Sequence, residues 1–138
     1  MPKDNLVLID TSVWIEYFLK KNVELEQTVD TLLDNVQIAT AAIIQAELIQ
    51  GSRSEKEVKY LKEYFKPLHW IESSDIHWQE AGELSLKLRQ SGKRINLTDC
   101  YIASLAKSAS ASIFSLDKHF IWIVKIGGYS LFPIEAMD

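Results

Sequence analysis

Four acidic residues of this chain have positions that suit chemistry on a phosphate group. Asp10 and Asp117 each directly follow a short apolar run of the kind that forms a buried strand. Asp99 stands at the start of a predicted helix, and Glu47 lies inside an apolar helical stretch. If such carboxylates converge, each pair about 4 Å apart costs on the order of 4 kcal/mol, which protons or cations must offset. Oxygen ligands select hard ions such as Mg²⁺ or Mn²⁺, which activate water and stabilise charge on a phosphoryl group.

Each acid also has a simpler explanation when it is considered alone. Asp10 and Asp117 could cap helices, which contributes about 1 kcal/mol, and Asp99 could be a first-turn acid favoured by about 0.3–1 kcal/mol. Glu47 could point to solvent beside neighbouring glutamines. The four acids together favour a common site, because three of them open helices at what should be one edge of a sheet.

The elements that would position these acids alternate between short strands and longer helices. Continuous apolar runs predict buried strands, and apolar residues at helical spacing predict the helices between them. We expect strands at 6–9, 36–39, 69–71, 113–116 and 130–132, and helices at 13–21, 24–35, 41–50, 54–65, 74–90, 98–108 and 117–126. This order predicts an α/β fold, a three-layer α/β/α sandwich with a central, mostly parallel sheet. Ligands bind beyond the carboxyl ends of the strands in such sheets, where the acids are expected.

The length and composition predict one domain spanning residues 1–138. Of the 138 residues, 47% are hydrophobic and 25% are charged, as in an ordinary globular protein. The single cysteine, Cys100, excludes an intramolecular disulfide and is expected to fill a small buried space. The histidines lack zinc-site spacing, and we expect His119 to lie at the surface or behind the ligands of a metal. With no long apolar run and a polar start, the chain is expected to be cytoplasmic.

The charge of the chain bears on whether it could bind nucleic acid. The net charge of −4 argues against a protein that holds nucleic acid by bulk charge, although two divalent cations would bring it to zero. Four cations precede the 98–108 helix, namely Lys87, Arg89, Lys93 and Arg94. They could form a solvated helix end, or they could bind RNA phosphates, with Lys93 and Arg94 closest in sequence to Asp99.

Four motifs in order resemble those of PIN domains. Residues 7–14 (VLIDTSVW) resemble the first motif, a hydrophobic strand followed by Asp-x-Ser/Thr. Residues 46–48 (AEL) with 51–53 (GSR) resemble the second motif. Residues 97–103 (LTDCYIA) resemble the third, and residues 114–120 (FSLDKHF) resemble the fourth, Thr-x-Asp-x-x-Phe. The resemblance spans almost the whole chain and is strongest to the VapC-type toxin ribonucleases of toxin–antitoxin pairs.

The resemblance implies a PIN-like α/β fold and an endoribonuclease that depends on Mg²⁺ or Mn²⁺. It implies that Asp10, Glu47, Asp99 and Asp117 form the acidic pocket that binds the metal. Ser12 would assist, either through water at the metal or by fixing the turn after Asp10. The chain has a serine at position 115 where the family usually has threonine, and because the hydroxyl is kept we expect little effect.

The resemblance also implies partners. VapC-like toxins act on RNA, bind a small antitoxin through apolar helices and usually form homodimers. Trp14 and the predicted 54–65 helix are therefore candidates for partner contact, although core packing is the expected role of most aromatic residues here.

Three other interpretations remain open from the sequence. The same residues would serve a PIN nuclease in RNA processing without a toxin role, and an overlapping antitoxin gene upstream would favour the toxin. A non-catalytic α/β interaction module, with acids that only cap helices, predicts no stabilisation by divalent ions. A phosphotransferase of the Asp-x-Asp type ranks low, because it needs a second carboxylate where Ser12 stands.

Overall fold

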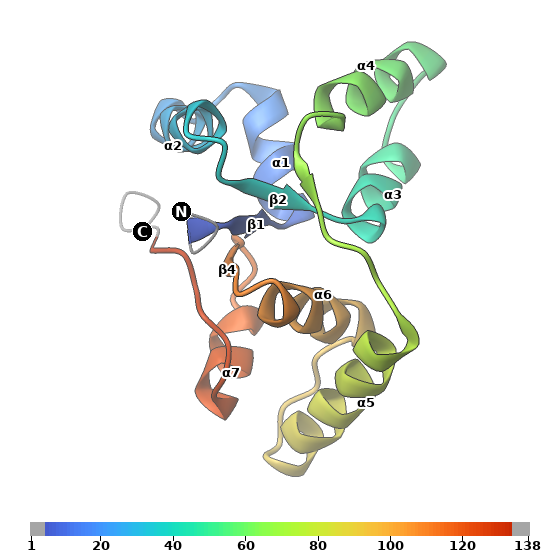
Figure 1. Cartoon of the computed structure of the whole chain (residues 1–138), viewed down its shortest axis with the longest axis vertical. Helices are drawn as coiled ribbons and strands as arrows, with labels where there is room; N and C mark the ends of the chain where they lie inside the picture. Colours follow the sequence, from blue (N-terminus) through green and yellow to red (C-terminus); the bar gives the residue numbers. More distant parts are fainter. Residues whose placement is uncertain (1–4, 134–138) are drawn as a thin grey trace.

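A parallel sheet separates two groups of helices (Figure 1). The computed structural model describes residues 5–133. The strands are β1 (Val7–Ile9), β2 (Ile38–Thr40), β3 (His69–Trp70) and β4 (Ser112–Phe114). The helices are α1 (Thr11–Leu19), α2 (Val23–Asp34), α3 (Ala42–Gln50), α4 (Glu55–Phe65), α5 (Asp75–Gln90), α6 (Leu97–Ser108) and α7 (His119–Ile126). The predicted three-layer α/β/α architecture is confirmed.

The topology brings the two chain segments that carry Asp10 and Asp117 together. The strand order is β3-β2-β1-β4, and every neighbouring pair is parallel. The chain crosses from β1 to β2 and β3 through α1–α4 on one side of the sheet, and returns through α5 and α6 on the other side (Figure 1). Because Ile9 pairs with Phe114, the residues that follow β1 and β4 leave the sheet side by side.

Strand β1 and helix α6 are rich in apolar residues because both are buried in the interior of the protein. All three β1 residues are buried, as expected of a central strand covered on both faces. Helix α6 packs against α5, α7 and β4, and every residue from Asp99 to Ala106 is buried. A carboxylate in the first turn of this helix is therefore held in the protein interior.

The predicted strand at 130–132 is wrong, because only a single bridge between Leu131 and Ile113 forms there. Several ends of the other strands also differ from the predicted ones, two of them for clear local reasons. The prediction of a strand beginning at Val36 is wrong, because Val36 has a left-handed backbone (φ 56°) and donates its N–H to the carbonyl of Leu33 to close α2. The prediction that a strand continues to Leu116 is also wrong, because β4 ends at Phe114. The Leu116 N–H donates instead to the hydroxyl of Ser12, outside the sheet.

The aromatic residues of α1 and α4 form a packed cluster. Trp14 is fully buried and lies against the rings of Tyr17, Phe18, Tyr64 and Phe65. The expectation that Trp14 contacts a partner is therefore wrong, and the alternative of core packing is confirmed for this residue. Among the described residues, no helix is long and apolar enough to cross a membrane.

Candidate active site

Asp10 occupies the turn between β1 and α1, and two serine hydroxyls hold its carboxylate. It is the N-cap residue of α1, yet its side chain makes no cap hydrogen bond. Ser12 and Ser115 both donate to the same oxygen, Oδ2, at 2.9 and 2.8 Å. The simple helix-cap explanation for the Asp10 side chain is therefore wrong. Asp10 is only 6% exposed, so these donors replace the water that a buried carboxylate loses.

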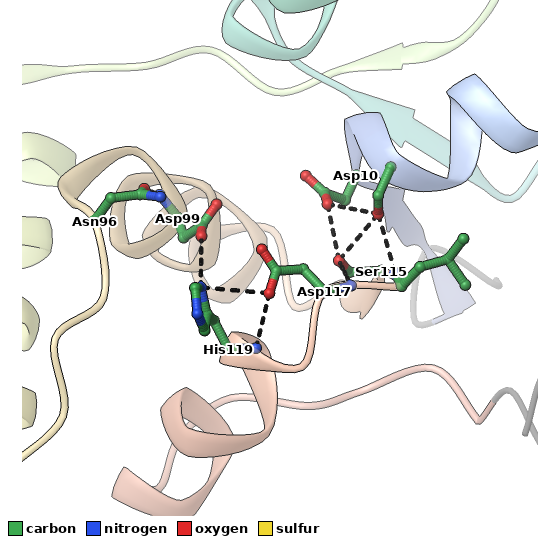
Figure 2. A network of polar contacts seen from close by, with 8 residues as sticks. Asp10, Asn96, Asp99, Ser115, Asp117 and His119 are labelled. Carbon is green, nitrogen blue, oxygen red and sulfur yellow. Dashed lines mark hydrogen bonds and ion pairs between the residues drawn. The ribbon is translucent and has the colours of Figure 1, made fainter.

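The same two serines tie the turn after β4 to Asp10. Ser12 Oγ accepts the N–H of Leu116 at 3.0 Å, and Ser115 Oγ accepts the N–H of Asp117 at 2.9 Å. Two short chains of hydrogen bonds thus run from the β4–α7 turn to Asp10 Oδ2. Figure 2 shows the other oxygen of Asp10 on the side of Asp117 and Asp99. Ser12 therefore links the turn that carries Asp10 to the β4–α7 turn.

Asp99 lies in the first turn of α6 with one carboxylate oxygen buried and without a hydrogen-bond partner. The side chain of Asn96 accepts the Asp99 N–H at 2.8 Å and so caps the helix. Asp99 is 9% exposed, and its Oδ2 has no hydrogen-bond partner among the described residues. Burial, followed by the negative charges of Asp10 and Asp117, raises the pKa of Asp99 to about 6. The imidazole of His119 opposes this rise.

Asp117 and His119 face Asp99 from the turn that leads into α7 (Figure 2). Asp117 Oδ1 accepts the His119 N–H at 2.9 Å, so α7 begins at His119 and not at position 117 as predicted. His119 Nδ1 lies 3.3 Å from Asp117 Oδ1 and 3.7 Å from Asp99 Oδ2. One ligand atom from each of these three residues lies within 4.8 Å of the other two.

Glu47 lies on α3, which is on the other side of the sheet from α6 and α7 (Figure 1). It is half-buried and accepts a hydrogen bond from the Thr11 hydroxyl at 2.6 Å. Thr11 is the residue after Asp10, so this bond joins α3 to the turn that carries Asp10. The alternative that Glu47 points freely to solvent is wrong. Glu47 and Asp10 lie outside the tight group of Asp99, Asp117 and His119.

The two basic residues singled out from the sequence have different environments. The Lys93 ammonium lies 3.6 Å from the centroid of the Trp122 ring on α7, in a cation–π contact. Arg94 is exposed in the connection between α5 and α6, two positions before the cap residue Asn96. Of the two, Arg94 has the exposed cation.

The donor set fits a divalent cation. Like-charged carboxylates are gathered here, and the pKa of Asp99 is raised first by burial and then by the negative charges of Asp10 and Asp117. A buried Asp99 oxygen without a hydrogen-bond donor is a costly group that a cation would satisfy. Carboxylate oxygens are the ligands preferred by Mg²⁺ and Mn²⁺. The residues present therefore suit the predicted metal.

Sequence reasoning gave too little weight to several residues at this site. His119 was expected at the surface or behind the metal ligands, and its exposed side chain confirms the surface position, but its ring nitrogen also faces two carboxylates. The sequence feature that could have indicated this is its position two residues after Asp117, whose carboxylate accepts the His119 N–H. Ser115 and Thr11 had only weak signals, because their partners lie 105 and 36 positions away in the chain.

The chain is similar in sequence to the PIN domain family and to proteins named as ribonucleases. Residues 7–125 match the family model of the PIN domain. The chain is 29% identical over 125 residues to VapC ribonuclease Mb1587 of Mycobacterium bovis and to ribonuclease VapC11 of Mycobacterium tuberculosis. In each case the match covers 88% of this chain and 93% of the relative.

Solved structures agree on the fold. VapBC2 from Rickettsia felis, solved with a DNA fragment from its promoter, superposes with a TM-score of 0.75 at 22% identity, covering 94% of this chain and 99% of that chain. VapBC-1 from nontypeable Haemophilus influenzae superposes with a TM-score of 0.74 at 21% identity, covering 92% and 96%. With the family model matching most of its length and the acids gathered at one edge of the sheet, this chain belongs to the PIN domain family.

Proposed function

We propose that this protein is a divalent-metal-dependent endoribonuclease that hydrolyses RNA phosphodiester bonds and acts as the toxin of a toxin–antitoxin pair. The curated relatives named above are ribonucleases, and the neighbouring solved structures are VapBC assemblies. An RNA-processing role without an antitoxin would use the same chemistry, so the genetic context decides between these two roles.

The observation that carries the proposal is the convergence of acids around one buried, unpartnered carboxylate oxygen. Asp99 Oδ2 has no hydrogen-bond donor, and the charges of Asp10 and Asp117 act on the same carboxyl group. A protein whose acids served only as helix caps would have no reason to accept this repulsion. A bound cation would offset this repulsion.

Each residue has a distinct task in the proposed reaction. A bound Mg²⁺ or Mn²⁺ would supply activation of water and stabilisation of negative charge on the phosphate. Asp99 and Asp117 would hold the cation together with the free oxygen of Asp10. Ser12 and Ser115 would keep Asp10 in one orientation, so that little rearrangement is needed when RNA binds. No serine, cysteine or histidine nucleophile is required.

Glu47 and Arg94 would act at the margin of the pocket. Glu47 accepts the hydrogen bond of the Thr11 hydroxyl and so supports the turn that carries Asp10, and it would add negative charge beside the pocket. Arg94 is exposed near the start of α6, where a cation could attract the RNA backbone. Lys93 would contribute less to RNA binding, because its ammonium already contacts Trp122.

The proposed partners are an antitoxin and a second copy of the chain. Helix α4 remains the candidate surface for the antitoxin, since Tyr60 on this helix is 58% exposed while Leu61 and Phe65 pack inward. A homodimer is proposed from the resemblance to VapC-type toxins.

Cleavage of a mixed pool of structured RNAs by the purified protein tests the activity. The reactions contain EDTA, Mg²⁺ or Mn²⁺, and wild type is compared with Asp10→Asn and Asp99→Asn. The matched control is Asp75→Asn, which neutralises an exposed acid in the first turn of α5. We expect cleavage that requires a metal and both site acids, and that survives in the control.

Thermal unfolding with and without Mn²⁺ separates the alternatives. Binding to the native state at 100 times the Kd stabilises a protein by about 2.7 kcal/mol. Stabilisation without RNA cleavage would count against the nuclease but leave a metal site. The absence of both effects would favour the non-catalytic interaction module.

A further inference from the structure

We propose that His119 is a metal ligand through Nδ1, so that the cation site contains nitrogen as well as oxygen and selects transition metals such as Mn²⁺ and Co²⁺ over Mg²⁺. This inference rests on the proposed function and concerns which ion the site takes. The four acids singled out from the sequence predict only oxygen ligands.

The distances suit shared coordination. In an octahedral shell with bonds of about 2.1 Å, adjacent ligand atoms lie about 3.0 Å apart and opposite ones about 4.2 Å apart. His119 Nδ1 lies 3.3 Å from Asp117 Oδ1 and 3.7 Å from Asp99 Oδ2, between these limits. One cation could therefore contact all three atoms with small side-chain movements.

The unpartnered oxygen of Asp99 is the second observation that points to a ligand here. Asp99 is 9% exposed as a residue and 13% exposed in its side chain, and its Oδ2 is itself buried. This oxygen lies 3.7 Å from His119 Nδ1, too far for a hydrogen bond. The same Nδ1 lies 3.3 Å from Asp117 Oδ1, so it stands between two carboxylate oxygens. A cation between Asp99 Oδ2 and His119 Nδ1 would satisfy both atoms at the observed separation.

The backbone holds the imidazole in this place. The His119 N–H donates to Asp117 Oδ1, and the Asp117 N–H donates to Ser115. These bonds fix the turn that precedes α7 and present the ring to Asp99 (Figure 2). The ring is half-exposed, so it leaves a route for a cation from solvent.

An imidazole ligand changes the preference of the site among metals. Imidazole nitrogen suits later first-row metals, and affinity rises from Mn²⁺ through Co²⁺ along the first-row series. Mg²⁺ prefers oxygen ligands and gives up its water reluctantly. A site with two or three carboxylates and one imidazole therefore favours Co²⁺ and Mn²⁺ over Mg²⁺.

Pulsed EPR of the Mn²⁺-loaded wild-type protein tests the nitrogen directly. The Mn²⁺ signal shows modulation from a coordinated nitrogen, and it changes when histidine is labelled with the heavy nitrogen isotope. We expect a histidine coupling in wild type and in the control His69→Gln, whose histidine lies on β3 and contacts the Val36 carbonyl. We expect the coupling to vanish in His119→Asn, which places an oxygen close to the position of Nδ1.

Metal affinities complete the test. In His119→Asn the Kd for Co²⁺ and Mn²⁺ should rise by about tenfold or more, while the Kd for Mg²⁺ changes by less than about threefold. Mn²⁺ binding without a histidine coupling in wild type would overturn the inference, and so would equal changes for Mg²⁺ and Co²⁺. Either result, with metal-dependent RNA cleavage retained, would leave the proposed function intact. If wild type bound no divalent ion, both proposals would fail.

Discussion

The two halves of the acidic site differ in how their carboxylates are satisfied. On the β1 side, Asp10 receives two hydroxyl hydrogen bonds on one oxygen. On the α6 side, Asp99 is similarly buried but leaves one oxygen without a donor, and the pKa of its carboxyl is raised to about 6. The protein itself supplies the hydrogen bonds that Asp10 needs. Asp99 Oδ2 instead requires a cation or a proton.

This difference shows where the fold accepts an energetic cost for function. Buried polar groups are normally paired, and an unpaired one costs roughly 1–3 kcal/mol. The chain carries enough serine and threonine near Asp10 to avoid that cost, but none of their hydroxyls reaches Asp99 Oδ2. The cost is thus confined to the residue that we propose as a metal ligand.

Neutralising Asp99 and Asp10 in separate variants should give the largest effects, and the two variants should differ in stability. Asp99→Asn and Asp10→Asn should each lower metal-dependent RNA cleavage by on the order of 10³-fold, because both act on charge at the reacting phosphate. Without metal, Asp99→Asn should raise the free energy of unfolding by about 1–2 kcal/mol, since it removes a buried charge that its neighbours repel. Asp10→Asn should give no such gain, because it weakens two hydrogen bonds to a charged group.

Urea unfolding in EDTA measures these stabilities, with Asp75→Asn as the control for loss of an exposed acid. Equal stabilisation by both site variants would contradict the contrast between the two halves.

Removing the Ser115 hydroxyl should leave Asp10 with fewer hydrogen-bond donors, which is already the case for Asp99. Ser115→Ala deletes the donor to Asp10 and the acceptor for the Asp117 N–H, so it should cost about 1–2 kcal/mol of stability. Cleavage should fall with it, because the β4–α7 turn is no longer tied to Asp10. Ser115→Thr keeps the hydroxyl and should stay close to wild type in both assays. A threonine variant as damaged as the alanine variant would argue against the hydroxyl as the cause.

The pH dependence of stability should come from the α6 half. The pKa of Asp99 is about 6 in the folded protein against an ordinary value of 3.8, so the folded state binds more protons between these values. Stability of the metal-free protein should therefore be greatest below about pH 4 for this group and fall as the pH rises through 6. Between pH 5 and pH 7 the loss should be about 1 kcal/mol.

Other groups titrate in the same range, so the measured quantity is the difference between wild type and Asp99→Asn. Urea unfolding in EDTA at pH 5 and pH 7 gives this difference. A variant with the same pH dependence as wild type would remove Asp99 as its source.

The sequence predicted the acids better than the groups that hold them. Asp10, Asp99 and Asp117 were predicted because a strand end or a helix start marks each one, and parallel strands bring such positions to one edge. The ends of β4 and α7 were misplaced because hydrogen bonds to Ser12 and within the Asp117 turn replace regular structure there. Such bonds join distant parts of the chain and leave no local periodicity.

The smallest predicted effect concerns the two basic residues beside the α6 half. Arg94→Gln should weaken RNA binding a few-fold and reduce the slope of log affinity against log salt by about 0.7–0.9, as expected for one lost phosphate contact. Lys93→Gln should leave that slope nearly unchanged and instead lower stability by about 0.5–1 kcal/mol, because its ammonium contacts the Trp122 ring. Filter binding of RNA by the Asp99→Asn protein at several salt concentrations measures the slope without cleavage. Equal slopes for the two variants would mean that Lys93 leaves Trp122 to bind RNA, or that neither residue contacts it. The contact between Lys93 and Trp122 would then not explain which of the two basic residues, Lys93 or Arg94, binds the phosphate backbone.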